Sequence, residues 1–154
     1  MDFLSYLRRP GAVACVRGMQ NNVRGSVRFY ETPQGVLVRT EITGLPGPSG
    51  IYAFHIHEGS DCAAPGGHYN PGGLQHPYHA GDLPPLFSAN GRAFSVFLTD
   101  RFSLRQIIDK TVIIHSGPDE FATQPSGNPG QILACGKIRS CCARLACPMD
   151  TNEY

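Results

Sequence analysis

Short runs rich in β-branched and aromatic residues recur along the chain, and they constrain its fold more than any other feature. Within them apolar residues alternate with others, as at Val36, Val38 and Ile42, which is the period of a strand with one buried face. The 18 glycines and 13 prolines leave no segment with a convincing helical period. The sequence therefore predicts an all-β fold, an antiparallel sandwich or Greek-key barrel. The expected strands lie at 12–16, 26–31, 35–42, 52–57, 92–99, 111–115 and 132–138.

Turns and loops separate these runs. The TPQG segment at 32–35 predicts a hairpin turn, and Asn90-Gly91 is the strongest short hairpin signal in the chain. Segments 58–91 and 116–131 are long, rich in Gly and Pro, and poor in aliphatic residues. Ordered loops longer than ~12–15 residues usually carry function. The segment 102–109 fits either a strand or a helical turn.

Length and composition indicate one globular domain, because 41% of the 154 residues are hydrophobic and only 16% are charged. A formal charge of +1 with scattered Lys and Arg argues against a nucleic-acid binder. No apolar run approaches the ~20 residues that span a bilayer, which argues against a membrane protein. The N-terminal FLSYL is too short for a signal peptide, so we expect a cytoplasmic location, with export by an unseen route left open.

Five of the six histidines fall within residues 54–82, FHIHEGSDCAAPGGHYNPGGLQHPYHAGD. His55 and His57 alternate in an expected strand, so both imidazoles project from one face, about 7 Å apart along the strand. His76, His79 and Asp82 form an H-x2-H-x2-D motif. Each motif alone also fits ordinary polar residues, but their gathering in one segment favours a metal site.

Counting the ligands gives two metal sites rather than one. Four imidazoles suit Cu(II), and three imidazoles with one carboxylate suit tetrahedral Zn²⁺. Both sets are complete only if one histidine is shared and uses both ring nitrogens. The copper set is His55, His57, His68 and His115, and the zinc set is His68, His76, His79 and Asp82.

These segments closely resemble the copper/zinc superoxide dismutase family. FHIHEG resembles its first copper-binding strand, GGHYNP its bridging-histidine loop and HAGDL its closing zinc motif; TVIIH and ILACGKI resemble its last two strands. The short spacing between the two zinc histidines and the LPPL segment that follows look like bacterial members. The resemblance implies an eight-stranded antiparallel Greek-key β-barrel with two long functional loops. It spans about 12–139, with an N-terminal extension at 1–11 and a cysteine-containing tail at 140–154.

The resemblance also implies roles. It implies an enzyme that holds copper and zinc and converts superoxide to O₂ and hydrogen peroxide. His68 would be the bridge between the metals and the catalytic proton carrier. Asp119 falls where the family has an aspartate that hydrogen-bonds a ligand of each metal. Cys62 and Cys135 match the family's disulfide, whose loop of 73 residue steps (135 − 62) stabilises the fold by about 4 kcal/mol in the chain-entropy model. A homodimer and a copper donor protein remain open as partners.

One position departs from the family. Active members usually carry an arginine three residues before the disulfide cysteine, to attract the anion, and this chain has Ile132 there. Segment 116–131 contains no Lys or Arg. Because electrostatic steering raises on-rates by ~10–10³, two functions remain: a superoxide dismutase, or a weak or inactive metal-binding protein of the same fold.

The tail contains a second arginine–cysteine segment, ARLAC at 143–147. Because PMDTNEY follows it and cannot form a closing strand, we prefer Cys135 as the disulfide cysteine; a tail that brings Arg144 near copper stays open. Cys15 is expected to be a small buried hydrophobe. The tail cysteines are expected to be incidental thiols, with a soft Cu(I)-binding or redox-active tail as the alternative; they are Cys141, Cys142 and Cys147.

Overall fold

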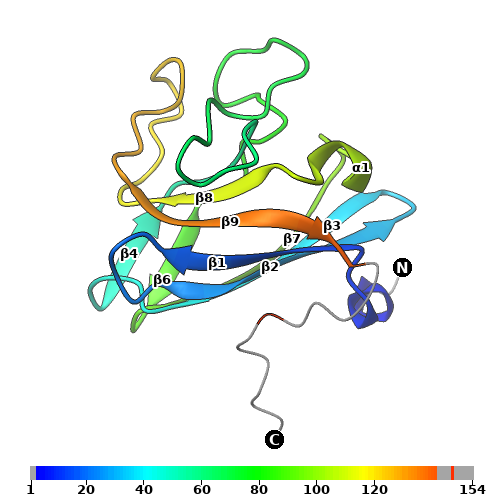
Figure 1. Cartoon of the computed structure of the whole chain (residues 1–154), viewed down its shortest axis with the longest axis horizontal. Coiled ribbons are helices and arrows are strands. Elements are labelled where there is room, and N and C mark those ends of the chain that lie inside the picture. Colours follow the sequence, from blue (N-terminus) through cyan, green and yellow to red (C-terminus); the bar gives the residue numbers. More distant parts are fainter. Residues whose placement is uncertain (1–2, 142–146, 148–154) are drawn as a thin grey trace, which may run out of the picture.

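The computed structural model describes residues 3–141 and Cys147. Nine antiparallel strands form the framework of this part of the chain (Figure 1), in the sheet order β4-β6-β7-β3-β2-β1-β9-β8-β5. The two outer strands of that order are separated in the chain by Ala53 alone, so the sheet curls into a nearly closed barrel. The strands are β1 Ala12–Gly18, β2 Arg24–Thr32, β3 Gly35–Thr43, β4 Ser49–Tyr52, β5 Phe54–His57, β6 Leu86–Ala89, β7 Arg92–Thr99, β8 Thr111–His115 and β9 Ile132–Ser140.

The predicted all-β antiparallel architecture is confirmed, with nine strands in place of the expected eight. The run expected at 52–57 is interrupted at Ala53. The Ala53 carbonyl accepts from the His115 N–H at 2.9 Å, and the Ala53 N–H donates to the Gly117 carbonyl at 2.8 Å. β6 was not among the expected strands, and only Tyr52 of β4 fell within one, because these four-residue strands, LFSA and SGIY, are too short to show a period. β3 pairs with β7 rather than with β4, the next strand in the chain, and this long connection is typical of a Greek key.

The predicted turns are present. β2 and β3 are joined by two residues at 33–34, and β6 and β7 by Asn90 and Gly91. Both of the latter have positive φ, 51° and 71°, as a type I′ turn requires. The segment at 102–109 contains a short helix, α1 Leu104–Ile107, and a 3-10 helix, η1 Phe3–Arg8, packs against β2. Within the described residues, no helix is long and apolar enough to cross a bilayer.

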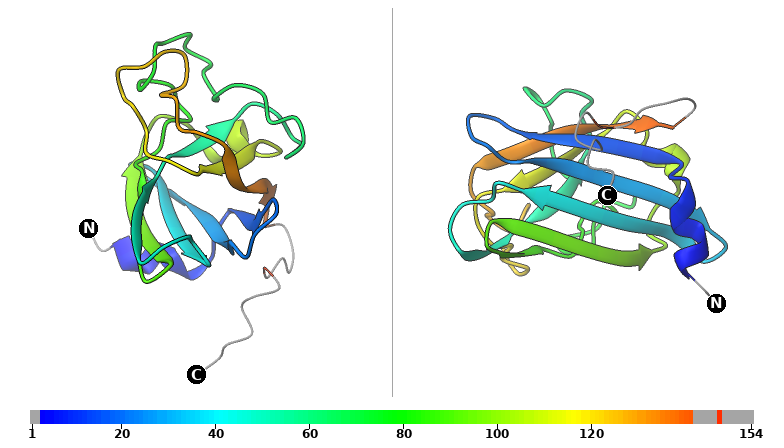
Figure 2. Two further views of the ribbon diagram at one scale, coloured as in Figure 1. Left: turned by 90° about the vertical axis from the view of Figure 1, so that its left-hand side faces the viewer. Right: turned by 90° about the horizontal axis from the view of Figure 1, so that it is seen from below.

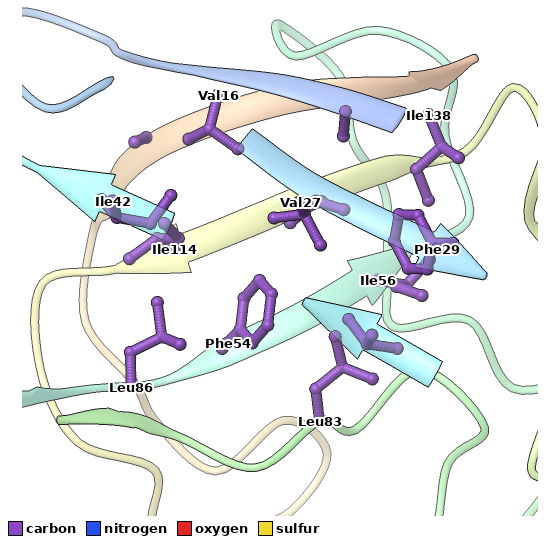
Figure 3. Close-up of a cluster of buried hydrophobic side chains, with 14 of the residues drawn as sticks. Val16, Val27, Phe29, Ile42, Phe54, Ile56, Leu83, Leu86, Ile114 and Ile138 are labelled. Atoms are coloured by element: carbon purple, nitrogen blue, oxygen red, sulfur yellow. The ribbon is translucent and has the colours of Figure 1, made fainter. Parts of the chain in front are cut away.

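The alternating residues of the strands fill the barrel. Val36, Val38, Thr40 and Ile42 all lie inside, as their two-residue period predicts. Facing strands supply branched and aromatic side chains that pack into one cluster (Figure 3). The barrel is thus a rigid platform for its loops. The labelled members of the cluster are Val16, Val27, Phe29, Ile42, Phe54, Ile56, Leu83, Leu86, Ile114 and Ile138.

Both long loops leave the barrel on the same side and lie next to each other (Figure 2, left). A disulfide between Cys62 and Cys135 ties the first loop to β9, with a Cα–Cα distance of 5.9 Å. This is the pair that the family resemblance implies.

A second disulfide corrects two expectations. Cys15 is not a simple buried thiol, and Cys147 is not an incidental one, because they are bonded to each other, with Cα atoms 5.6 Å apart. The pairing depends on Cys147 lying next to Cys15 of β1, 132 residues away in the sequence, which no local pattern reports. It also excludes Cys147 as the partner of the metal loop. Arg144 and Cys142 lie outside the described residues.

Candidate metal centre

The histidines of β5 lie on the outer face of the barrel wall, beneath the two long loops. Ile56 points into the core and is fully buried, so His55 and His57 point the opposite way. The first loop folds back over them, because His57 pairs with His68 and His55 pairs with Asp82 in isolated β-bridges. His115, at the end of the neighbouring strand β8, completes the group.

Two groups of metal-ligating side chains result among the described residues, and both are buried. In each group the candidate ligand atoms lie within 4.8 Å of one another. His68 belongs to both, and its ring centroid lies 3.9 Å from that of His55 and 5.4 Å from that of His79. The copper group is His55, His57, His68 and His115, and the zinc group is His68, His76, His79 and Asp82.

In the copper group, one nitrogen of each ring is oriented by the protein and the other is left for a ligand. His55 Nε2 lies 2.6 Å from Asp119 Oδ2, and His57 Nδ1 lies 2.8 Å from the Gly66 carbonyl. His115 Nδ1 lies 3.4 Å from the carbonyl of Gly130. Within the described structure, the opposite nitrogens are buried without a hydrogen-bond partner: His55 Nδ1, His57 Nε2, His68 Nε2 and His115 Nε2.

A buried polar atom without a partner costs about 1–3 kcal/mol, and most proteins avoid it. Four such nitrogens converging on one point therefore fit a metal that prefers imidazole, as Cu(II) does. The donor chemistry matches copper, and the burial excludes solvent as the regular partner.

The zinc group has the dimensions of a tetrahedral site. Zn–N distances of about 2.0–2.1 Å give a tetrahedron whose edges measure about 3.3 Å. His68 Nδ1 lies 3.3 Å from His79 Nδ1, and Asp82 Oδ2 lies 3.1 Å from His76 Nδ1 and 3.3 Å from His79 Nδ1. Asp82 Oδ1 lies 2.7 Å from His68 Nδ1. The two nitrogens of His68 thus face different groups, as a shared ligand requires.

Asp119 connects the two groups from behind. One carboxylate oxygen lies 2.6 Å from Nε2 of His55, and the other lies 2.7 Å from Nε2 of His76. Its side chain is only 2% exposed. Gly127 covers this contact with φ of +75°, and a Cβ there would collide with the Asp119 carboxylate. Accepting from both rings, Asp119 fixes their tautomers so that both Nδ1 atoms are left for metal.

Burial keeps the imidazoles neutral, the form that binds metal. It lowers the pKa of His57 and His115 to about 4, and that of His55 much further, aided by the neighbouring histidines. Burial opposes ionisation of Asp82, but the hydrogen bond with His68 and the nearby histidines still lower its pKa. Burial raises the pKa of Asp119, against the opposing effect of His76.

A channel of about 510 Å³ leads to both groups. Among the described residues that line it, none is Lys, Arg, Asp or Glu, and its polar side chains other than the histidines are uncharged: Asn70, Gln75, Gln124 and Ser126. Ile132 is paired directly with His115 across β8 and β9. The structure therefore places an aliphatic side chain beside the copper group, where the family usually has its arginine.

Two residues that support the zinc loop were not anticipated from the sequence. Gln124 pairs with the backbone of His76 in both directions: His76 N–H donates to Oε1 at 3.0 Å, and Nε2 donates to the His76 carbonyl at 2.7 Å. Arg101 donates to three carbonyls of the same loop. Neither residue belongs to a motif, so only the fold reveals its partners.

The family model for copper/zinc superoxide dismutase (SODC) matches residues 23–138. A superoxide dismutase [Cu-Zn] of Legionella pneumophila is 39% identical over 127 residues, covering 75% of this chain and 77% of the relative. The copper chaperone for superoxide dismutase of Homo sapiens is 31% identical over 150 residues, covering 86% of this chain and 54% of the relative. The crystal structure of the clock protein EA4 superposes with a TM-score of 0.75 at 32% identity, covering 85% and 95% of the two chains. The chain therefore belongs to the copper/zinc superoxide dismutase family, and copper and zinc are the cofactors that its two histidine groups suit.

Proposed function

We propose that this protein is a superoxide dismutase, converting two superoxide anions and two protons to O₂ and hydrogen peroxide. The observation that carries the proposal is the convergence of four buried, unpartnered imidazole nitrogens next to a second, tetrahedral ligand group that shares His68. His55, His57, His68 and His115 would hold copper, and His68, His76, His79 and Asp82 would hold zinc.

Copper supplies the alternation between two oxidation states, and zinc has no redox chemistry. His68 is the catalytic residue that moves a proton. Its Nδ1 faces the zinc group, and Nε2, which faces the copper group, would take a proton in one half of the cycle and give it towards peroxide in the other. Asp119 holds His55 and His76 in the required tautomers on either side of it.

Electrostatics argue for a slow enzyme. Superoxide is an anion, and the channel has no cationic side chain among its described lining residues to attract it. Without steering, the association rate loses a factor of ~10–10³. The second candidate function is therefore a metal-binding protein with weak or no turnover. The similarity to a copper chaperone supports it, since that relative bears the name of a protein that handles copper for a dismutase.

A dismutase assay on protein reconstituted with copper and zinc separates the two functions. We expect two bound metals per chain and activity that His115→Ala removes, because the variant loses one of four copper nitrogens. Ile132→Arg should raise the rate at low salt by ~10-fold or more and make it fall with ionic strength. Two bound metals with activity no greater than that of His115→Ala would support the metal-binding function instead.

We also propose partners and a cellular location for the protein. A copper donor protein follows from the copper group, and a homodimer is tested by the mass of the protein in solution. The cytoplasmic location expected from the sequence competes with export, and the two disulfides support export because such bonds persist in oxidising compartments. Fractionation of cells that produce the full-length protein distinguishes these locations.

A further inference from the structure

Arg101 reaches from the end of β7 to the loop that carries the zinc group. Its Nη1 donates to the backbone carbonyl oxygens of Pro77 at 3.2 Å, His79 at 3.3 Å and Asp82 at 3.2 Å. These carbonyls span residues 77–82, which is the H-x2-H-x2-D motif from the residue after His76 to its end. Two of them belong to residues whose side chains complete the zinc group.

The barrel holds the backbone of Arg101 on both sides. On one side, the Arg101 N–H donates to Thr99 Oγ1 at 3.2 Å, at the last residue of β7. On the other, Phe102 is buried, and its ring packs edge-on against Phe29 of the core at 6.5 Å. The guanidinium therefore extends from a fixed point on the barrel to a loop that has little regular structure of its own.

Backbone bonds hold the Asp82 end of the loop on β5, because Ile56 N–H donates to the Gly81 carbonyl at 2.8 Å and Leu83 N–H donates to the Phe54 carbonyl at 3.2 Å. His79 N–H donates to Asp82 Oδ2 at 3.0 Å and Asp82 N–H donates to the His79 carbonyl at 3.1 Å, which closes a local turn. Asp82 is joined to β5 by its bridge with His55, and Arg101 adds contacts at Pro77, His79 and Asp82. The backbone dihedrals set the directions of both the carbonyl and the side chain of a residue, so a residue whose carbonyl is held in place also has its side chain directed. All three carbonyls accept from the same Nη1, whose two N–H bonds lie in the fixed plane of the guanidinium at the end of a long side chain. A lysine side chain is shorter and ends in a freely rotating ammonium group, so it reproduces this arrangement only in part.

We propose that Arg101 is a positioning residue of the zinc site, which holds the backbone of His79 and Asp82 so that their side chains point at the metal. The inference rests on the zinc site proposed above. His76 has a separate attachment through Gln124 and Asp119, so loss of Arg101 acts on the other half of the zinc group. Three members of the copper group, His55, His57 and His115, lie on β5 and β8 and are not among the contacts of Arg101.

Zinc affinity of the full chain, measured by competition with a chromogenic chelator, tests the proposal without reference to dismutase activity. We expect Arg101→Ala to weaken zinc binding by about 10–100-fold, the usual effect of removing a group that orients a metal ligand. Arg101→Lys should recover only part of this loss. Arg105→Ala is the matched control, because Arg105 is an exposed arginine on the nearby helix α1 and should leave zinc affinity unchanged.

Two further readouts separate positioning from general stability. The zinc-induced rise in Tm should shrink in Arg101→Ala, and the visible spectrum of Co²⁺ bound in the zinc site should change, while Arg105→Ala matches the wild type in both. A lower Tm of the metal-free protein with unchanged zinc affinity would overturn the proposal, as would full recovery by Arg101→Lys. Should Arg101→Ala fail to fold, the Lys variant decides. A wild-type protein that binds no zinc would overturn the zinc site itself.

Discussion

Acid should destabilise the metal-free protein well above the pH at which ordinary carboxylates titrate. Burial lowers the pKa of His57 and His115 to about 4, from an ordinary value of 6.5. Between these values the unfolded chain binds protons that the folded protein excludes. The stability contributed by the neutral rings is therefore fully present above pH 6.5 and is lost as the pH falls towards 4.

The size of the effect follows from the two pKa values. A histidine pKa of 6.5 in the unfolded chain and about 4 in the folded protein corresponds to about 3 kcal/mol of unfolding free energy for each ring. About 2 kcal/mol of this is lost by pH 5. The lowered pKa of Asp82 acts in the same direction but only below its ordinary value of 3.8. Asp119, whose pKa is raised, works in the opposite direction above 3.8.

Urea unfolding of the metal-free protein at pH 7.5, 6 and 5 measures this effect. We expect the free energy of unfolding to fall by at least about 4 kcal/mol over this range, about 2 kcal/mol from each of these two histidines, with His55 acting in the same direction. His115→Gln should remove about 2 kcal/mol of the dependence, the contribution of one ring. Bound metal should move the loss to lower pH, because metal and proton compete for the same nitrogens. An unfolding free energy that is flat or rises as the pH falls would refute the argument from buried neutral imidazoles.

Three other substitutions probe the scaffold. Asp119→Asn keeps the shape of the side chain but presents an amide N–H to one of the two rings in place of an acceptor. We therefore expect about 10–100-fold weaker metal binding in equilibrium dialysis. Unchanged affinities would contradict the role of Asp119 in fixing the tautomers of the two histidines. Gly127→Ala should weaken zinc binding and lower Tm, since the added methyl collides with the Asp119 carboxylate; calorimetry with and without zinc measures both, and a wild-type Tm would contradict it. Cys15→Ser opens a loop of 132 residues, and the chain-entropy model predicts a loss of about 5 kcal/mol, seen in oxidised but not in reduced protein; metal content should not change.

Much of the candidate site follows from the sequence because strand geometry is local. The alternation of His55 and His57 puts both rings on one face, and the hairpin residues Asn90 and Gly91 fix a turn that two backbone dihedrals dictate. The shared role of His68 follows from ligand numbers alone, since two sets of four cannot be completed from seven residues otherwise. The resemblance to a known family then names Asp119 and the Cys62–Cys135 pair.

The tertiary structure decided what depends on contacts between distant segments. Ala53 interrupts a strand because its backbone groups pair with residues of β8 and the loop after it. Cys15 meets Cys147 across 132 residues, and Arg101 meets three carbonyls of a loop that precedes it by about twenty residues. The sequence by itself determines strand faces and ligand types, because these depend on neighbouring residues. It does not determine which backbone carbonyl or thiol lies beside a given side chain, because that depends on how the barrel closes.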